Sequence, residues 1–205
     1  MLKPVFEAAR QLQAISQTGL EYTDNHFDRD RFEQIGKIAM NLMSYATGHE
    51  PSGFIQAFAF EKGYATPKID VRAAAFRDNR ILLVREHSDG LWTLPGGWAD
   101  VGDSPSIAAV REVKEESGFA VRVTKLAAVY DRDLHGLAPI PYHAYKLFFI
   151  CDILGGAATT SAETDAVDFF DQHSLPPLST TRVVEKQIHH MFEHYRDPSR
   201  STSFD

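Results

Sequence analysis

The sequence contains a single cysteine, Cys151, among its 205 residues, so no disulfide can form within the chain. Cys151 stands in the apolar run KLFFICDIL, which is typical of a buried core thiol rather than a nucleophile. Basic residues are also few, 21 against 28 acidic ones, for a net charge of -7. Since a duplex nucleic-acid binder needs a basic surface to neutralise phosphates, this balance argues against duplex nucleic acid as a partner.

Long apolar runs are lacking as well. The longest uncharged apolar patch near the N-terminus, GFIQAFAF, is too short to cross a bilayer. Glu7 and Arg10 interrupt the first fifteen residues before an apolar core of signal-peptide length can form. Internal repeats and low-complexity tracts are also missing. We therefore expect a soluble, cytoplasmic protein with no membrane partner.

The N-terminal part instead shows helical periodicity. Residues 4–17 place apolar side chains at three- and four-residue steps, which predicts an amphipathic helix ending at Gly19. A second apolar stripe follows the polar turn TDNHFD and predicts a helix capped by Asp28 or Asp30. A two-helix hairpin is too small to be secure alone, so its apolar faces need the rest of the chain or a second copy. A homodimer is the expectation.

Strand-like patterns begin at residue 69, after Gly and Pro residues that mark a boundary. The runs IDVRAAAF, RILLVREH, VRVTKLAAVYDRD, AYKLFFICDIL and VDFF each predict a strand. A closing helix is predicted from Ser179 or Thr180, and the polar tail SRSTSFD is expected to fray. The predicted fold class is α+β, with a helical N-terminal domain over residues 1–66 and a second domain over residues 67–205.

One short helix is unusually acidic. Ser104 is a preferred N-cap residue and Gly118 a natural C-terminal stop, so a helix is predicted over residues 105–117. At about 100° per residue, one side of this helix is apolar and the other acidic. The apolar side holds Ile107, Val110 and Val113, and the outward side holds Glu112, Glu115 and Glu116.

Three carboxylates in one arc repel one another by a few tenths of a kcal/mol per pair. Bound Mg²⁺ or Mn²⁺ would offset this repulsion, because hard carboxylate oxygens are the ligands that these ions prefer. A solvated helix face is the alternative. The preceding glycine-rich stretch LPGGWADVGD favours the metal site, because glycines let backbone groups approach a cleft closely.

The stretch from Gly97 to Phe119 matches the signature of the Nudix hydrolases. That signature is Gly, five residues, Glu, seven residues, Arg-Glu, an aliphatic, any residue, Glu-Glu, any residue, Gly and an apolar residue. Here Asp103 replaces the first glutamate and keeps a carboxylate that is one methylene shorter. The chain resembles a bacterial subgroup with a helical N-terminal domain. This resemblance implies a small helical domain followed by a Nudix α/β/α sandwich with a mixed sheet.

The resemblance also implies a set of site residues. The implied metal ligands are the carbonyl of Gly96 or Gly97 and the carboxylates of Glu112, Glu115 and Glu116. Arg111 would orient the glutamates, and metal-assisted water would attack a diphosphate bridge. The proton of that water would pass to Glu115, to Glu116 or to Glu163 in the late loop SAETDAV. An ordinary loop acid is the alternative for Glu163.

Members of the subgroup hydrolyse nucleoside diphosphate derivatives such as CDP-choline or ADP-ribose to two monophosphates. Candidate substrate contacts are Arg85 at a strand end, Trp98 beside the glycine turn, and Tyr142 and His143 beside the GLAPIP loop. Nudix enzymes specific for ADP-ribose often carry a proline shortly beyond the signature, and the next proline here is Pro139, which favours a CDP-alcohol. A nucleoside triphosphate pyrophosphatase and a non-catalytic ligand sensor are the alternatives, and the complete set of carboxylates argues against the sensor.

Overall fold

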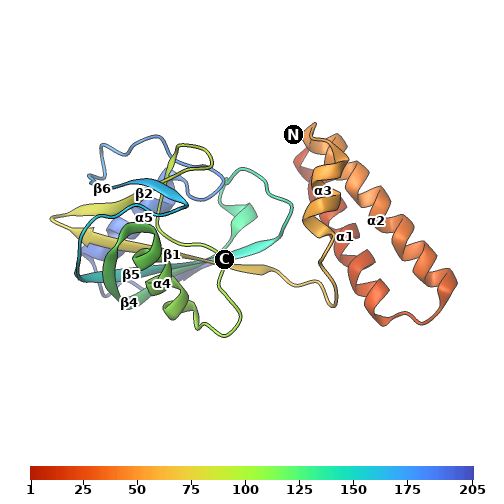
Figure 1. Ribbon diagram of the computed structural model, residues 1–205, viewed down its shortest axis with the longest axis horizontal. Helices are drawn as coiled ribbons and strands as arrows, with labels where there is room; N and C mark the ends of the chain where they lie inside the picture. Colours follow the sequence, from red (N-terminus) through yellow and green to blue (C-terminus); the bar gives the residue numbers. More distant parts are fainter. The chain divides into compact units, whose positions relative to one another are not determined.

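The computed structural model describes all 205 residues and divides the chain into two compact units (Figure 1). The helical unit comprises Met1–Pro67 together with the short segment Pro141–His143. The sheet unit comprises Lys68–Ile140 and Ala144–Asp205. None of the helices combines the length and the apolar character that a membrane crossing requires.

The helical unit is built on a hairpin of two long helices. Its helices are α1 (Lys3–Tyr22), α2 (His26–Thr47) and α3 (Pro51–Phe58). Figure 1 shows α1 and α2 lying side by side. Their shared core is made by Phe6, Ala9, Ala39, Met40, Met43, Ala46 and Phe54.

Two details of the hairpin differ from the sequence-based expectation. Gly19 does not end α1, which continues to Tyr22. The glycine is used for close packing instead, because a Cβ at this position would overlap the ring of Phe32 in α2. The N-cap of α2 is Asn25 rather than either aspartate, and its side chain accepts a hydrogen bond from the backbone N–H of Phe27 at 2.9 Å.

The sheet unit contains a mixed sheet. Its strands are β1 (Lys68–Arg77), β2 (Arg80–Glu86), β3 (Trp92–Thr93), β4 (Phe119–Asp131), β5 (Ala144–Gly156), β6 (Thr164–Phe170) and β7 (Ser203–Phe204). They follow the order β3-β2-β1-β5-β4-β7, and β6 pairs with β2. The pairs β1–β5 and β4–β7 are parallel and the other pairs antiparallel, so the prediction of a mixed sheet is confirmed.

A helix covers each face of this sheet, as the prediction of an α/β/α sandwich requires (Figure 1). The strand β1 alternates its side chains between the two faces. Ala74 and Phe76 pack in the core that includes α5 (Glu185–Arg196), whereas Ala73 and Ala75 pack in the core that includes α4 (Pro105–Ser117).

The helix α4 has the predicted bounds, but its buried stripe differs from the predicted one. Ile107 is 57% exposed, so the prediction that it packs on the sheet is wrong. The buried stripe runs instead through Ala109, Val113 and Glu116 at the i, i+4 and i+7 positions. Small alanine side chains let this side of the helix lie close to the sheet. Glu116 is therefore carried to the buried side.

The C-terminal region also differs from the prediction. The last helix, α5, begins at Glu185 rather than near Ser179, and residues 179–184 form an irregular segment before it. The polar tail does not fray, because Ser203–Phe204 pairs with β4 and the Thr202 hydroxyl donates to the Leu126 carbonyl at 2.7 Å.

Candidate active site

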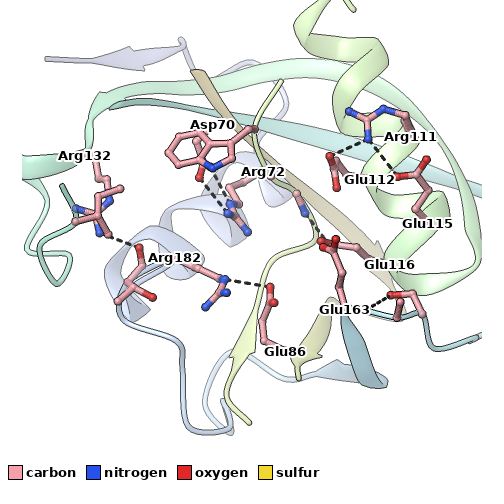
Figure 2. Close-up of a pocket in the computed structure, with 17 residues that line it drawn as sticks. Asp70, Arg72, Glu86, Arg111, Glu112, Glu115, Glu116, Arg132, Glu163 and Arg182 are labelled. Atoms are coloured by element: carbon pink, nitrogen blue, oxygen red, sulfur yellow. Dashed lines mark hydrogen bonds and ion pairs between the residues drawn. The ribbon is translucent and has the colours of Figure 1, made fainter. Parts of the chain in front are cut away.

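A cavity of about 680 Å³ opens in the sheet unit beside α4 (Figure 2). Its lining includes the carboxylates of Glu86, Glu112, Glu115, Glu116 and Glu163. It also includes the guanidinium groups of Arg72, Arg111, Arg132 and Arg182. Such a mixture can hold a cation and an anion at the same time, which is what binding a metal–phosphate complex requires.

Glu116 lies deepest among the acids of α4. The residue is 5% exposed, and the backbone N–H of Gly96 donates to its Oε2 at 2.9 Å. Burial raises the pKa of its carboxyl to about 8, although the charge of Arg72 and the Gly96 hydrogen bond oppose this. The expectation that all three glutamates face outward is therefore wrong for Glu116, because the helix rotation places it against the sheet.

Arg111 holds the outer carboxylates together. Its Nη1 donates to Glu112 at 3.0 Å and to Glu115 at 3.1 Å. Its Nε donates to Asp103 at 3.1 Å, and Nη2 forms an ion pair with Asp100 at 3.1 Å. The shorter side chain at position 103 thus still reaches the arginine. One guanidinium fork orients four carboxylates, which limits their mutual repulsion.

The glycine turn before α4 is sterically required. Gly96 has φ 141, and a Cβ there would collide with the carbonyl of Val71 in β1. The carbonyl of Gly97 accepts a hydrogen bond from the Val71 N–H at 2.8 Å, so the sheet already uses it. This contact favours Gly96 over Gly97 as the source of a carbonyl ligand. A Cβ on Gly97 would lie 3.3 Å from Glu112.

The donor set beside the turn fits a hard divalent cation. Glu112, Glu115 and Glu116 supply carboxylate oxygens to one cavity, and their side chains range from buried to exposed. Glu116 is a desolvated carboxyl that accepts its hydrogen bond from the backbone N–H of Gly96, and a bound cation would offset the cost of burying its charged form. The residues present therefore fit the divalent metal that the Nudix resemblance implies.

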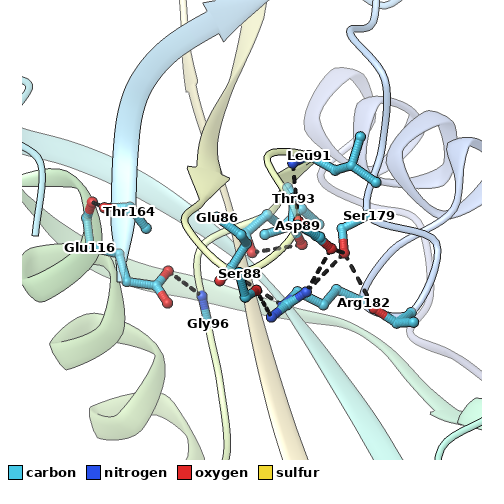
Figure 3. A network of polar contacts seen from close by, with 12 residues as sticks. Glu86, Ser88, Asp89, Leu91, Thr93, Gly96, Glu116, Thr164, Ser179 and Arg182 are labelled. Atoms are coloured by element: carbon cyan, nitrogen blue, oxygen red, sulfur yellow. Dashed lines mark hydrogen bonds and ion pairs between the residues drawn. The ribbon is translucent and has the colours of Figure 1, made fainter. Parts of the chain in front are cut away.

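A second polar network lies on the other side of the cavity (Figure 3). Arg182 pairs through Nε with Glu86 at 3.1 Å and through Nη1 with Asp89 at 3.0 Å. The Ser179 hydroxyl donates to the same Asp89 oxygen at 2.7 Å. These contacts join the end of β2 to the segment before α5, and burial raises the pKa of the Glu86 carboxyl.

The structure gathers only part of the predicted substrate-binding set. Trp98, 43% exposed, lines the cavity together with Glu163. Arg85 lies outside it, because successive strand residues point to opposite faces, and its Nε is 2.5 Å from Asp165. Tyr142 and His143 belong to the helical unit, where the Tyr142 hydroxyl donates to the Ala57 carbonyl at 2.7 Å. A role of these three residues in substrate binding stays a prediction.

Several cavity residues were missed by sequence reasoning. They are Asp70, Arg72, Glu86, Arg132 and Arg182. A signal existed for the first two, since Asp70 and Arg72 interrupt an otherwise apolar strand and share one of its faces. Arg132 begins a single-turn 3-10 helix (Arg132–Leu134) and Arg182 lies in a turn, and both segments are too short for periodicity to indicate the direction of a side chain.

Two family models match the chain. Residues 66–192 match the one described as the NUDIX domain, and residues 3–58 match a UDP-X-like, N-terminal oligomerisation domain. The chain is 41% identical to the putative ADP-ribose pyrophosphatase YjhB of Bacillus subtilis (strain 168) over 199 residues, which are 97% of this chain and 96% of that protein.

The chain is also similar to solved structures of proteins with related names. A crystal structure of UDP-X diphosphatase is 30% identical with a TM-score of 0.64, and the match covers 100% of this chain and 99% of the other. A crystal structure of an ADP-ribose pyrophosphatase from Streptococcus suis 89-1591 is 41% identical with a TM-score of 0.63. That match covers 68% of this chain and 100% of the other.

Proposed function

Because this chain belongs to the Nudix hydrolases, we propose that it uses Mg²⁺ to hydrolyse the diphosphate bond of a nucleoside diphosphate derivative to two monophosphates. The observation that supports this most directly is the cavity, which combines three carboxylates of α4 with arginines from three other segments. A diphosphate needs both kinds of group, because its negative oxygens bind arginine directly and bind carboxylates only through a metal.

The metal would be held by Glu112, Glu115, Glu116 and the Gly96 carbonyl, and Mn²⁺ is a chemically similar substitute. When bound, such an ion lowers the pKa of water and offsets negative charge on phosphoryl oxygens. The protein's own contribution is to hold the carboxylates in place, and Arg111 does so through its contacts with Glu112 and Glu115.

Other cavity residues take the remaining roles in this proposal. Glu163, an exposed acid on the loop before β6, accepts the proton of the attacking water, with Glu115 and Glu116 as the alternatives. Arg182 adds positive charge near the phosphates, and its contacts with Glu86 and Asp89 fix its position. Trp98 offers an exposed ring on which a base can stack.

The relatives narrow the choice of substrate. Two of them carry the name ADP-ribose pyrophosphatase, and the structure matched over the whole chain carries the name UDP-X diphosphatase. These names favour ADP-ribose and UDP derivatives as substrates. The sequence alone favours a CDP-alcohol instead, because no proline follows the Nudix signature before Pro139. CDP-choline and the nucleoside triphosphates remain necessary members of a substrate screen.

The test is a product-resolved screen of the purified protein with Mg²⁺. ADP-ribose, UDP-sugars, CDP-choline and nucleoside triphosphates are compared, with and without a chelator. Two monophosphates from a diphosphate compound would support the proposal, and loss of activity with the chelator would support the metal. Release of pyrophosphate from triphosphates alone would contradict it in favour of a triphosphate pyrophosphatase.

We also propose that the helical unit joins two copies of the chain into a homodimer. This proposal is supported by the match of residues 3–58 to an oligomerisation domain. It is supported as well by large exposed apolar side chains on α1 and α2, namely Ile15, Tyr22, Ile38 and Tyr45. Such side chains at seven-residue spacing make an apolar surface that association would cover.

A further inference from the structure

Three charged side chains are buried together below the cavity. Asp70 in β1 is 6% exposed, Arg72 in the same strand 4%, and Lys146 in β5 is fully buried at 0%. The parallel pairing of β1 with β5 places Asp70 and Lys146 in register. This cluster, the Asp70–Arg72–Lys146 cluster, contains none of the metal ligands proposed above.

The contacts within the cluster are short and specific. Asp70 accepts hydrogen bonds from Arg72 Nε at 2.8 Å, from Arg72 Nη2 at 3.0 Å and from Lys146 Nζ at 2.7 Å. Arg72 Nη1 donates to the carbonyl of Leu94 at 3.1 Å. Figure 2 shows Arg72 in the middle of the cavity view, between Arg111 and its glutamates on one side and Arg132 on the other.

The charges in the cluster do not balance. While Lys146 is protonated, two cations share one carboxylate, which leaves one positive charge in excess at a site with almost no solvent. Burial lowers the pKa of Lys146 to about 7, although the charge of Asp70 opposes this. An excess buried charge is costly, so a cluster that only tied β1 to β5 would be more stable with a single cation. Burial works to raise the pKa of Asp70, but Arg72 and Lys146 overcome this effect and the pKa is lowered, so Asp70 is charged and fully engaged.

Only one of the two cations reaches the cavity. Arg72 lines it, whereas Lys146 is buried, contacts Asp70 and is not one of the lining residues. A guanidinium has five N–H donors. The two contacts of Arg72 with Asp70 and its contact with the Leu94 carbonyl use three of them, which leaves one N–H on each terminal nitrogen. The excess charge is therefore presented to the cavity by a rigidly held donor group.

We propose that Arg72 binds a non-bridging oxygen of the substrate's diphosphate and that Lys146 is a buried positioning residue that keeps Asp70 from neutralising it. The inference rests on the proposed function, which supplies the diphosphate. Because Asp70 is shared with Lys146, part of the Arg72 charge remains free to attract the anion. Removing Lys146 leaves a balanced pair of Asp70 and Arg72, which attracts an anion less strongly.

The test measures binding without turnover. The α,β-methylene analogue of ADP-ribose is titrated with Mg²⁺ into the full-length wild type and into Lys146→Met, by calorimetry. We expect about tenfold weaker binding in the variant from the loss of one nearby charge. The matched control is Arg122→Met, which removes one positive charge from the exposed Arg122–Asp152 pair between β4 and β5 and leaves binding unchanged.

Two further variants keep the test decisive. Lys146→Gln retains an N–H donor for Asp70, so it separates loss of charge from loss of folding, and we expect the same weakening. Arg72→Gln removes the contact itself and is expected to weaken binding by about a hundredfold. In turnover assays the Lys146 variants should raise KM about tenfold and change kcat by no more than about twofold, since Lys146 does not touch the reacting atoms.

Either of two results would overturn the inference about Arg72 and Lys146. Wild-type affinity in the Lys146 variants, with only a lowered Tm, would make the cluster purely structural and overturn the inference. A fall in kcat with unchanged affinity would overturn it as well. If the wild type hydrolyses none of the compounds, the proposed function fails, and binding of inorganic pyrophosphate decides the inference separately. Weaker pyrophosphate binding by Arg72→Gln would support the anion site, and equal binding would reject it.

Discussion

At the scale of single residues, Glu115 and Glu116 are neighbours with the same side chain but lie in different environments. The Glu115 side chain is 59% exposed and is held by Arg111, whereas Glu116 is 5% exposed and contacts the backbone of Gly96. Helix periodicity alone placed both on the outward side, because it gives the angles between side chains around the helix axis but not the direction in which the sheet lies. The buried position makes Glu116 the carboxylate with most to gain from a cation.

Replacing Glu116 should abolish most turnover without unfolding the protein. We expect Glu116→Gln to lower kcat by roughly 100-fold or more, because the amide keeps the size of the side chain but loses the charge. Steady-state kinetics with Mg²⁺ and circular dichroism measure the two effects. Glu185→Gln, an exposed acid on α5, is the control and should retain activity. Full activity of Glu116→Gln would place the site elsewhere.

The stability of the metal-free protein should depend on pH through the same residue. Burial raises the pKa of the Glu116 carboxyl from 4.5 to about 8. The folded state therefore keeps a proton that the unfolded state releases between these values. The stabilisation from this group is fully present below pH 4.5 and is lost as the pH rises through 8, a change of up to a few kcal/mol.

This dependence can be measured by thermal unfolding in a chelator at acidic and at alkaline pH. Glu116→Gln should raise the Tm on the alkaline side, since it removes the cost of a buried charge, and should have little effect on the acidic side. Added Mg²⁺ should raise the wild-type Tm on the alkaline side. An equal Tm change at both pH values would show that Glu116 does not titrate in this range.

At the scale of elements, the turn that precedes α4 is the most constrained segment of the site. We expect Gly96→Ala to destabilise the protein by several kcal/mol and to lower activity, because its Cβ would collide with the Val71 carbonyl. Gly102→Ala is the matched control, as Gly102 also has a positive φ, 103, but open space around it. Chemical denaturation compares the two, and equal losses would show that backbone strain alone is responsible.

Local signals predicted some elements better than others. The bounds of α4 follow from Ser104 and Gly118, which act within one turn of the helix, so sequence alone could place them. The start of α5 could not be placed in this way. Ser179 looks like an N-cap, but its hydroxyl donates to Asp89, a residue far away in the sequence. Tertiary contacts of this kind override local propensity.

At the scale of the whole molecule, the helical unit should control the oligomeric state. We expect the double variant Ile38→Glu, Tyr45→Glu to dissociate the dimer, because two charges would have to be buried on an apolar surface. Sedimentation velocity measures the mass. Leu154→Glu, the same kind of change at a 64% exposed residue of the sheet unit, is the control and should leave the mass unchanged. A monomeric wild type would contradict the proposal of a dimer.

The sequence also predicted the order of the two parts and the acidic side of the cavity. Both follow from contiguous patterns, namely two helical stripes and one loop-to-helix signature. The basic side as a whole could not be predicted, because Arg72, Arg132 and Arg182 come from three separate segments that meet only in the folded sheet unit. Arg72 interrupts an apolar strand, but in the sequence Arg132 and Arg182 are each indistinguishable from a surface charge.

The proposed function requires that this cavity hydrolyse a diphosphate bond with the help of a metal ion. The most direct measurement is mass spectrometry of the products that the wild type makes from ADP-ribose with Mg²⁺ and with a chelator. We expect AMP and ribose phosphate in equal amounts with Mg²⁺, and intact substrate with the chelator. Cleavage that is unaffected by the chelator, or intact nucleoside diphosphate compounds across the whole substrate screen with Mg²⁺, would contradict it.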